Sequence, residues 1–538
     1  MDSEIQVKDI QLDQAVENET SVVVEAGVPL QDAGGSDPKD GQQKRGFSDG
    51  DGGYVKKQKR IREAWDEKAE ARILDESGNP LYNDPRRPKK KVACLIGYCG
   101  TGYHGMQLNP GTKTIEYELF EAFVKTGAIS RDNSNDLKKS SFMRAARTDK
   151  GVHAAGNVVS LKMIVEDDNL LEKLNAELPD QIRVWGIERV NKSFDCRKMC
   201  SSRVYEYLMP SFCLLPPKPT SPLGKHLAET LNANPDSLRE DKEGVEWWEE
   251  YNRVLGERGI SAEDVEKVLE ATINSELATD ETDALGKQIR RIGTELRRNY
   301  RCTPERLAVF RDALKLYEGS HNFHNFTLGK HFKDPSGTRF MKDLTVSEPF
   351  VIEGTEWVSI KIHGQSFMLH QIRKMVGLAA LVARTGASLD RITDSFTNIK
   401  LNIPKAPALG LLLEQPVYEA INTRLEKFGY KHVDFAPYET EMLEFKKSFI
   451  YDKIYAEEIK ENVFYGFFSF IDGFVGNDGF KGIKMFDFLT GNFSKVNNGE
   501  KEVKEAKKKT QPAETVAATE EATKVTETEP LEAKPATE

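Results

Sequence analysis

The fold is decided around RAARTDKGVHAAGNVVSLKM, residues 144–163. The first half of this stretch places Asp149 in a short, Gly-containing turn, and residues 157–163 mix β-branched with polar side chains. Such a mixture is typical of a half-buried strand, which would hold the preceding turn rigidly. Three cations flank the carboxylate in sequence: Arg144, Arg147 and Lys150. Because neighbouring cations oppose protonation, we predict that Asp149 is ionised, as suits a nucleophile; the alternative is a purely structural, salt-bridged turn.

Composition indicates that part of the chain is unpacked. The 538 residues are 38% hydrophobic and 30% charged, and the apolar residues are scarce at both ends. Residues 1–90 begin acidic and Gly-rich, and residues 495–538 are nearly all Glu, Lys, Thr, Ala and Pro. We predict two disordered tails, because such segments cannot bury enough apolar surface to offset the cost of chain ordering.

Charge is segregated along the chain. The net charge is −10, yet basic residues cluster at 56–62, 86–91 and 290–301. Screening limits the reach of distant acidic residues to about 8–10 Å, so these clusters can still bind phosphates. The pair Lys44-Arg45, followed after a ten-residue spacer by the basic residues 56–60, has the layout of a bipartite nuclear import signal. We therefore expect an import receptor as a partner and a nuclear location, with a solvated basic linker as the alternative.

Neither secretion nor membrane insertion is indicated. The N-terminus lacks the pattern of a signal or transit peptide, and no apolar stretch reaches the length of a membrane span. The six cysteines do not form the framework of a small secreted domain. Cys94 and Cys99 with His104, or Cys196 with Cys200, could supply zinc ligands, but structural thiols are the better explanation because CxxC spacing is absent.

Hydrophobic periodicity predicts two sheet-forming halves separated by an insertion. The predicted domains are a tail at 1–90, a first half at 91–210, a partly helical insertion at 211–303, a second half at 304–421, a helical extension at 422–494 and a tail at 495–538. Strands are expected at 92–98, 157–164, 182–190, 202–210 and within 340–364; helices at 114–127, 169–178, 304–316 and 368–385. We expect the binding site at the junction of the two halves.

Five motifs resemble those of one enzyme family. The segment from Arg147 to His153 is similar to the Arg-Thr-Asp-x-Gly-Val-His signature of the TruA-type pseudouridine synthases, with Lys150 at the variable position. Four further segments match that family in its order: residues 97–107, 203–207, 367–377 and 406–413. The resemblance covers about residues 92–418. It implies an α+β fold, a mixed and mostly antiparallel sheet with flanking helices around a central basic cleft.

The resemblance also implies a site. Asp149 is expected to be the nucleophile, Tyr205 to stack on the target base and relay a proton, and Arg373 to orient Asp149. Five further residues are expected to bind substrate: Arg147, Lys150, His153, Gly410 and Leu411. Taken alone, Tyr205 could be a core tyrosine and Arg373 an ordinary cation near a helix end.

The activity implied is isomerisation of uridine to pseudouridine in RNA. Attack of the carboxylate at C1′ of the ribose or at C6 of the base both remain open. The chemistry requires no cofactor, although zinc is described in fungal relatives, which the long tails and the extension resemble most. Those relatives imply action at several tRNA positions, including the anticodon stem-loop and intron-containing precursors, with U2 snRNA and mRNA as further expected substrates.

Two other classes of function are alternatives to this one. A catalytically inactive RNA-binding or chaperone protein could share the fold. A zinc-dependent base deaminase would need His-x-Glu and Pro-Cys-x-x-Cys, and the sequence contains neither.

Overall fold

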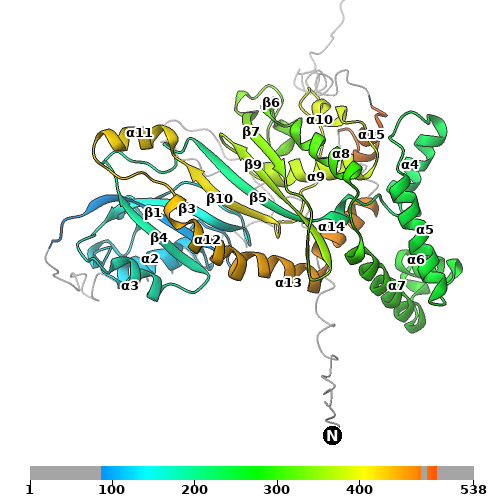
Figure 1. The fold of residues 1–538 in the computed structure, drawn as a ribbon, viewed down its shortest axis with the longest axis horizontal. Helices are drawn as coiled ribbons and strands as arrows, with labels where there is room; N and C mark the ends of the chain where they lie inside the picture. Colours follow the sequence, from blue (N-terminus) through cyan, green and yellow to red (C-terminus); the bar gives the residue numbers. More distant parts are fainter. Residues whose placement is uncertain (1–85, 474–481, 494–538) are drawn as a thin grey trace, which may run out of the picture. The chain divides into compact units, whose positions relative to one another are not determined.

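A computed structural model describes residues 86–473 and 482–493 (Figure 1). The basic segments 44–45 and 56–62 and almost all of both predicted tails lie outside the described residues. The observed architecture is the predicted α+β class, a sheet with helices packed on it. The domain boundaries drawn at residues 210, 303 and 421 stay predictions. None of the described helices is long and apolar enough to cross a membrane.

One ten-stranded sheet forms the centre of the structure, with the order β4-β1-β3-β10-β5-β9-β7-β6, β2 beside β3 and β8 beside β9. All the pairings are antiparallel except that of β10 with β3. The strands are β1 Lys90–Tyr98, β2 Met143–Arg144, β3 His153–Met163, β4 Ile182–Arg189, β5 Ser202–Pro210, β6 Gly319–Asn322, β7 Thr338–Val346, β8 Phe350–Ile352, β9 Thr355–Gly364 and β10 Leu411–Val417.

The sheet does not divide into the two expected halves. Strand β10, from the second half, lies between β3 and β5, both from the first half. Leu412 pairs with His153 on one side, and Leu413 pairs with Tyr205 on the other. The two predicted halves therefore contribute interleaved strands to one sheet. Pairing between strands distant in sequence depends on tertiary packing, which the local pattern of apolar residues does not specify.

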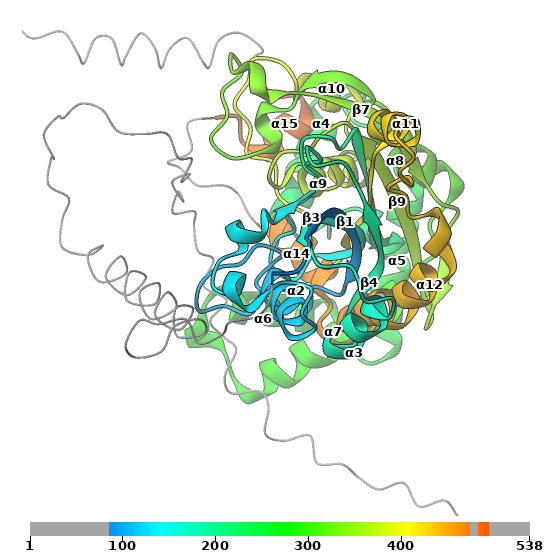
Figure 2. The same ribbon diagram turned by 90° about the vertical axis from the view of Figure 1, so that its left-hand side faces the viewer.

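Helices cover both faces of this sheet (Figures 1 and 2). The strand β1 is buried on both faces from Val92 onward, which accounts for its nearly continuous apolar sequence. Helix α9 is buried along nearly its whole length. The helices are α2 Ile115–Lys125, α3 Leu170–Glu177, α4 Pro222–Ala233, α5 Lys242–Glu257, α6 Ala262–Ile273, α7 Asp280–Asn299, α8 Pro304–Lys315, α9 Gln371–Arg384, α10 Asp390–Asp394, α11 Glu419–Lys427, α12 Glu439–Phe445, α13 Asp452–Glu461, α14 Val463–Gly473 and α15 Met485–Thr490.

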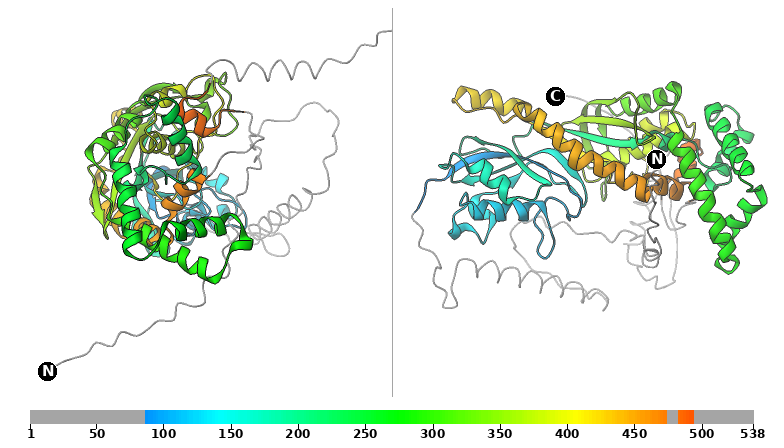
Figure 3. Two further views of the ribbon diagram at one scale, coloured as in Figure 1. Left: turned by 90° about the vertical axis from the view of Figure 1, so that its right-hand side faces the viewer. Right: turned by 60° about the horizontal axis from the view of Figure 1, so that its bottom comes forward.

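The insertion forms a helical layer with a core of its own. Helices α4 to α7 lie together at the end of the sheet away from β4 (Figures 1 and 3). Five buried residues make a second, separate hydrophobic cluster among these helices: Tyr251, Leu255, Ile260, Ile289 and Ile292. One face of α7 therefore packs in this small core, and the opposite face can carry charged side chains.

The C-terminal extension is tied to the sheet by buried charges. Helices α12 and α13, joined by a π-helical turn at Lys446–Tyr451, run across one face of the sheet (Figure 1). The Lys446 ammonium lies 3.3 Å from Glu206 on β5 and donates to both carboxylate oxygens of Glu414 on β10 at 2.8 Å. Tyr451 also donates to Glu206, at 2.6 Å. Because side chains alternate along a strand, this face of β5 is opposite to the face that carries Tyr205.

Gly410 permits the insertion of β10. A Cβ at this position would overlap the carbonyl oxygen of Leu208 and come within 3.0 Å of Phe464, and Leu208 N donates to Gly410 O at 2.8 Å.

Replacing Gly410 with Ala should therefore push β10 away from β5 and lower the free energy of unfolding by about 1–3 kcal/mol. Chemical denaturation measures this change. The matched control is Gly466→Ala in α14, where a Cβ meets nothing within 4 Å; that variant should be as stable as the parent or slightly more so, and an equal loss in both would refute the packing argument.

Candidate active site

Asp149 is presented by a hydrogen-bonded turn immediately before β3. Val152 N donates to Asp149 O at 3.1 Å, and Gly151, the third residue of the turn, has φ 74°. A type II-like turn needs a positive φ at that position, which explains the glycine. The Asp149 side chain is 38% exposed, so the carboxylate is shielded from bulk water yet can be reached.

A glycine-rich loop, residues 99–107, holds this turn by direct contact of backbone with backbone. Met106 N donates to Thr148 O at 3.1 Å, and Gly151 N to Tyr103 O at 3.3 Å. At Gly105, with φ 93°, a Cβ would lie 2.7 Å from Thr148 O. The first family-like motif, residues 97–107, is therefore a support for the Asp149 turn rather than a phosphate-binding loop.

His153 is a structural residue. It is fully buried, and its Nδ1 accepts a hydrogen bond from Gly100 N at 3.1 Å. Burial lowers the pKa of His153 to about 4, so the imidazole is neutral at physiological pH. The prediction that His153 binds substrate is wrong for this structure, because the ring has no exposed surface; its role is to tie the glycine-rich loop to β3.

The cations next to Asp149 in sequence do not surround its carboxylate. Arg144 forms an ion pair with the buried carboxylate of Glu116 in α2. Arg147 and Lys150 are exposed, where they can meet a polyanionic ligand. The expectation that these three residues keep Asp149 ionised is thus wrong in its cause, since proximity in sequence within a turn does not fix the direction of a side chain.

The charges that act on Asp149 come from the second half of the chain. The close approach of His370 lowers the pKa of the Asp149 carboxyl, with further lowering by Arg373 and Lys405, against an opposing effect of burial. The His370 Nδ1 lies 3.5 Å from Asp149 Oδ2, which is an ion-pair distance rather than a short hydrogen bond. Asp149 is ionised at physiological pH, as predicted. The residues that lower its pKa, however, are His370, Arg373 and Lys405.

His370 was missed by the sequence analysis, although it lies inside the fourth motif. It immediately precedes α9 and has φ 65°, ψ 0°, a left-handed conformation that costs a non-glycine residue on the order of 1–3 kcal/mol. Residues three apart at a helix start share a face, so its spacing from Arg373 was the available signal. Lys405 has no comparable local signal, because it reaches the site from an irregular segment.

Arg373 connects α9 to the segment that leads into β10. Its Nε donates to Ala406 O at 2.6 Å, and Ala406 N donates back to Arg373 O at 3.1 Å. The charge of Arg373 favours the ionised form of Asp149, yet no ion pair within 4 Å joins the two among the described residues. The structure thus brings Arg373 into the site with a second, structural task; its role in orienting Asp149 stays a prediction.

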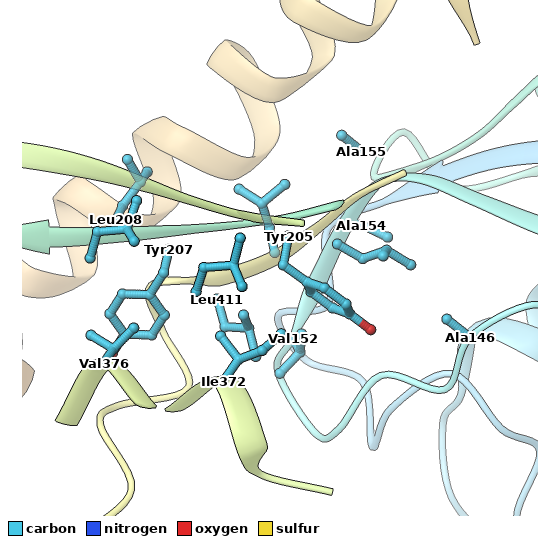
Figure 4. Packing of buried hydrophobic residues seen from close by; sticks show 14 of the residues in the cluster. Ala146, Val152, Ala154, Ala155, Tyr205, Tyr207, Leu208, Ile372, Val376 and Leu411 are labelled. Carbon is cyan, nitrogen blue, oxygen red and sulfur yellow. The ribbon is translucent and has the colours of Figure 1, made fainter. Parts of the chain in front are cut away.

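Tyr205 lies on β5 at the edge of the same site. Its ring packs edge-on against Phe367, with centroids 5.1 Å apart, and Figure 4 shows its hydroxyl pointing away from Ile372 of α9. Burial, reinforced by the charge of Asp149, raises the pKa of Tyr205 to about 12. The phenol is therefore protonated at physiological pH. Its neighbour Tyr207 is a core residue, since its hydroxyl donates to Pro407 O at 2.8 Å.

Gly410 and Leu411 have different places. Gly410 is buried against the backbone of β5, and its contact with substrate stays a prediction. Leu411 is buried at the start of β10 and lies beside Tyr205 and Ile372 (Figure 4). It forms part of an apolar wall next to the tyrosine, and its contact with substrate stays a prediction.

The cysteines do not fit a zinc site. Burial raises the pKa of the Cys94 thiol far above its ordinary value and that of Cys196 to about 12, so neither supplies a thiolate readily. Over residues 86–473 and 482–493, no group of three or more His, Cys, Asp or Glu side chains could hold a metal ion. We therefore assign zinc no part in the chemistry.

The chain is similar to known proteins over most of its length. A family model described as tRNA pseudouridine synthase matches residues 313–419. The tRNA pseudouridine synthase 1 of Candida albicans is 52% identical over 451 residues, covering 79% of this chain and 74% of that protein. That of Saccharomyces cerevisiae is 55% identical over 411 residues, covering 74% of each. The tRNA pseudouridine(27/28) synthase of Saccharomyces cerevisiae is 41% identical, covering 69% of this chain and 96% of that protein.

The fold and the site together define a pseudouridine synthase, an enzyme that isomerises uridine within RNA. More narrowly, the chain belongs to the TruA-type tRNA pseudouridine synthase family. The resemblance seen in the sequence motifs is confirmed.

His370→Asn tests the electrostatic part of this site, because asparagine tolerates the left-handed conformation but carries no charge. Without His370, the pKa of Asp149 should rise toward its ordinary value. The acid-side loss of activity should then begin at a higher pH than in the parent enzyme, whereas kcat/KM at neutral pH should change little, because the carboxylate is ionised there in both enzymes. A pH profile of kcat/KM on tRNA measures both effects.

The control is His432→Asn, since His432 is an exposed residue of the C-terminal extension. It should leave the profile unchanged. An unshifted acid limb in His370→Asn would show that His370 does not control the ionisation of Asp149.

Proposed function

We propose that this enzyme isomerises uridine to pseudouridine in tRNA with Asp149 as its nucleophile. One observation carries the proposal: a half-exposed carboxylate, Asp149, whose pKa is lowered by His370, Arg373 and Lys405, lies beside a protonated phenol, Tyr205. In this arrangement the carboxylate can attack an electrophilic carbon, and the phenol can then take part in proton transfer. A non-catalytic RNA-binding role would not require the nucleophile to be held in its charged form.

The reaction begins with extrusion of the uridine from its stack, which costs a few kcal/mol. Asp149 then attacks C1′ of the ribose, where a carboxylate C–O bond forms as the N1–C1′ bond breaks, or it attacks C6 of the base. The freed uracil turns, its C5 bonds to C1′, and the carboxylate is released. Last, C5 loses its proton and N1 takes one up from water, so that no net proton is exchanged. The net reaction is an isomerisation, so no redox equivalent or nucleotide is consumed and no cofactor is needed.

Tyr205 has two tasks in this scheme. Its ring provides a face on which the extruded base stacks, an interaction worth about 1–3 kcal/mol. Its hydroxyl, protonated at physiological pH, helps to pass the C5 proton to water. The edge-on contact with Phe367 holds the ring at the boundary between the apolar wall and the Asp149 turn.

The proposed substrates extend to several tRNA positions, including the anticodon stem-loop and intron-containing precursors, and to U2 snRNA and mRNA. The names of the relatives support tRNA as the substrate, and one of them specifies positions 27/28 for that protein. The remaining substrates are proposed from the resemblance of the sequence motifs alone. Nuclear location and an import receptor are proposed from the basic residues 44–60 alone. Mapping pseudouridine in RNA from cells that lack this protein tests the list of substrates.

Asp149→Asn should abolish isomerisation while tRNA binding is retained. The amide keeps the size of the side chain but cannot attack, so the single-turnover rate should fall by at least about a thousandfold. Pseudouridine formed in a tRNA transcript and the Kd for that transcript are measured in parallel. Asp180→Asn, an exposed carboxylate on the loop before β4, serves as the control. Full activity in Asp149→Asn would refute the assignment of the nucleophile.

Two substitutions of Tyr205 separate stacking from proton transfer. Tyr205→Phe keeps the ring, so it should bind tRNA normally and lose only the rate of the step that removes the C5 proton. Tyr205→Leu removes the stacking face as well, and the apparent affinity for tRNA should weaken by about tenfold or more. Single-turnover kinetics with 5-deuterated uridine in the transcript identifies the slow step. If both variants behave alike, the hydroxyl has no separate task.

A further inference from the structure

A basic depression lies away from Asp149, where the insertion meets the C-terminal extension. It has a volume of about 570 Å³ and is lined by Arg290, Arg291 and Arg298 of α7, by the β8–β9 turn and by Asn462 between α13 and α14. Volumes of about 300–1,000 Å³ are typical of ligand sites. These arginines belong to the basic block that the sequence isolates within an otherwise acidic insertion.

The walls of the depression are fixed by hydrogen bonds between three distant segments. Arg298 Nη2 donates to Ile459 O of α13 at 2.6 Å. Arg301 Nη2 donates to Gly354 O in the β8–β9 turn at 3.1 Å. The guanidinium of Arg297 is buried 3.4 Å above the ring of Tyr465 of α14. The surface that a ligand would meet is therefore held in place before the ligand arrives.

The solvent-facing arginines of the depression can bind a ligand without breaking an ion pair. Arg290 and Arg291 are exposed, and neither has an ion-pair partner within 4 Å in the part of the chain that the structure describes. Glu295 also lines the depression, but it is paired with Arg258 through two hydrogen bonds of 3.0 Å. Glu353 opposes part of the charge, and three arginines against one free carboxylate leave a net positive surface.

We infer that this depression binds backbone phosphates of the tRNA substrate, at a site separate from the pocket for the reacting uridine. Guanidinium groups make paired hydrogen bonds to phosphate oxygens. The depression is open to solvent at Arg290 and Arg291, so phosphates on the surface of a folded RNA can reach it. The inference rests on the proposed function, because it assigns the ligand to the same RNA that Asp149 modifies. The insertion would then select for folded tRNA over a short RNA that carries only the target uridine.

The test compares two double variants of the full chain with equal change of charge. Arg290→Gln with Arg291→Gln removes the exposed cations of the depression. Lys267→Gln with Lys287→Gln removes two exposed cations of the same insertion that do not line it. The Kd for a tRNA transcript is measured from about 50 to 200 mM salt, and initial rates are measured on that transcript and on an isolated stem-loop with the same target uridine.

The arginine variant should bind the tRNA about tenfold more weakly. The slope of log Kd against log salt should fall by about 0.7–0.9 for each phosphate that the protein no longer neutralises. Its rate on the stem-loop should stay at the parental value, and the lysine control should resemble the parent in every measurement. Unchanged thermal unfolding excludes a folding defect.

An equal loss of tRNA affinity in both double variants would show that only net charge matters, and it would overturn the inference. An arginine variant that binds tRNA as tightly as the parent would also overturn it. A loss on the stem-loop equal to that on the tRNA would also overturn it, because the depression would then serve the reacting nucleotide. Failure of the proposed function is distinct from all of these outcomes: the parent enzyme would form no pseudouridine in either RNA.

Discussion

The insertion of β10 between β3 and β5 is the constraint on which the site depends. This one strand lies next to the strand that follows the Asp149 turn and next to the strand that carries Tyr205. Through Ala406, just before β10, it is also hydrogen bonded to Arg373 on α9. Asp149, Tyr205 and Arg373 therefore have their positions defined relative to a single segment. Gly410 makes this possible, because no side chain fits between β10 and the β5 backbone.

The charges of the site follow from the same constraint. The first half of the chain supplies the carboxylate but uses Arg144 for the buried Glu116, so the countercharge for Asp149 must come from elsewhere. His370, Arg373 and Lys405 provide it once α9 and the segment before β10 pack against the turn. Partial burial alone would raise the pKa of Asp149, and the residues from the second half of the chain outweigh that effect. A competent site thus requires both halves of the chain.

Local patterns in the sequence predicted the elements better than their arrangement. Five elements begin and end within about two residues of their predicted bounds: β1, β5, α2, α3 and α8. Their patterns of apolar residues depend only on the burial of each segment by itself. Strand β3 begins four residues earlier than predicted, because residues 153–156, His-Ala-Ala-Gly, contain no β-branched side chain that would indicate a strand. Motif resemblance predicted roles for Asp149, Tyr205 and Arg373, which the structure brings into one region. The burial of His153, the pairing of Arg144 and the approach of His370 depend on contacts between distant segments, which no local pattern contains.

The position of β10 also sets the order in which the enzyme can mature on the ribosome. Strands β3 and β5 are complete when about 210 residues have been synthesised, yet they cannot join into one sheet until residue 417 has left the exit tunnel. The buried carboxylate of Glu206 and the partly buried one of Glu414 then remain without their cation until Lys446 has been synthesised, and an uncompensated buried charge is costly. A nascent chain therefore contains the Asp149 turn early and completes the sheet around it only late in translation.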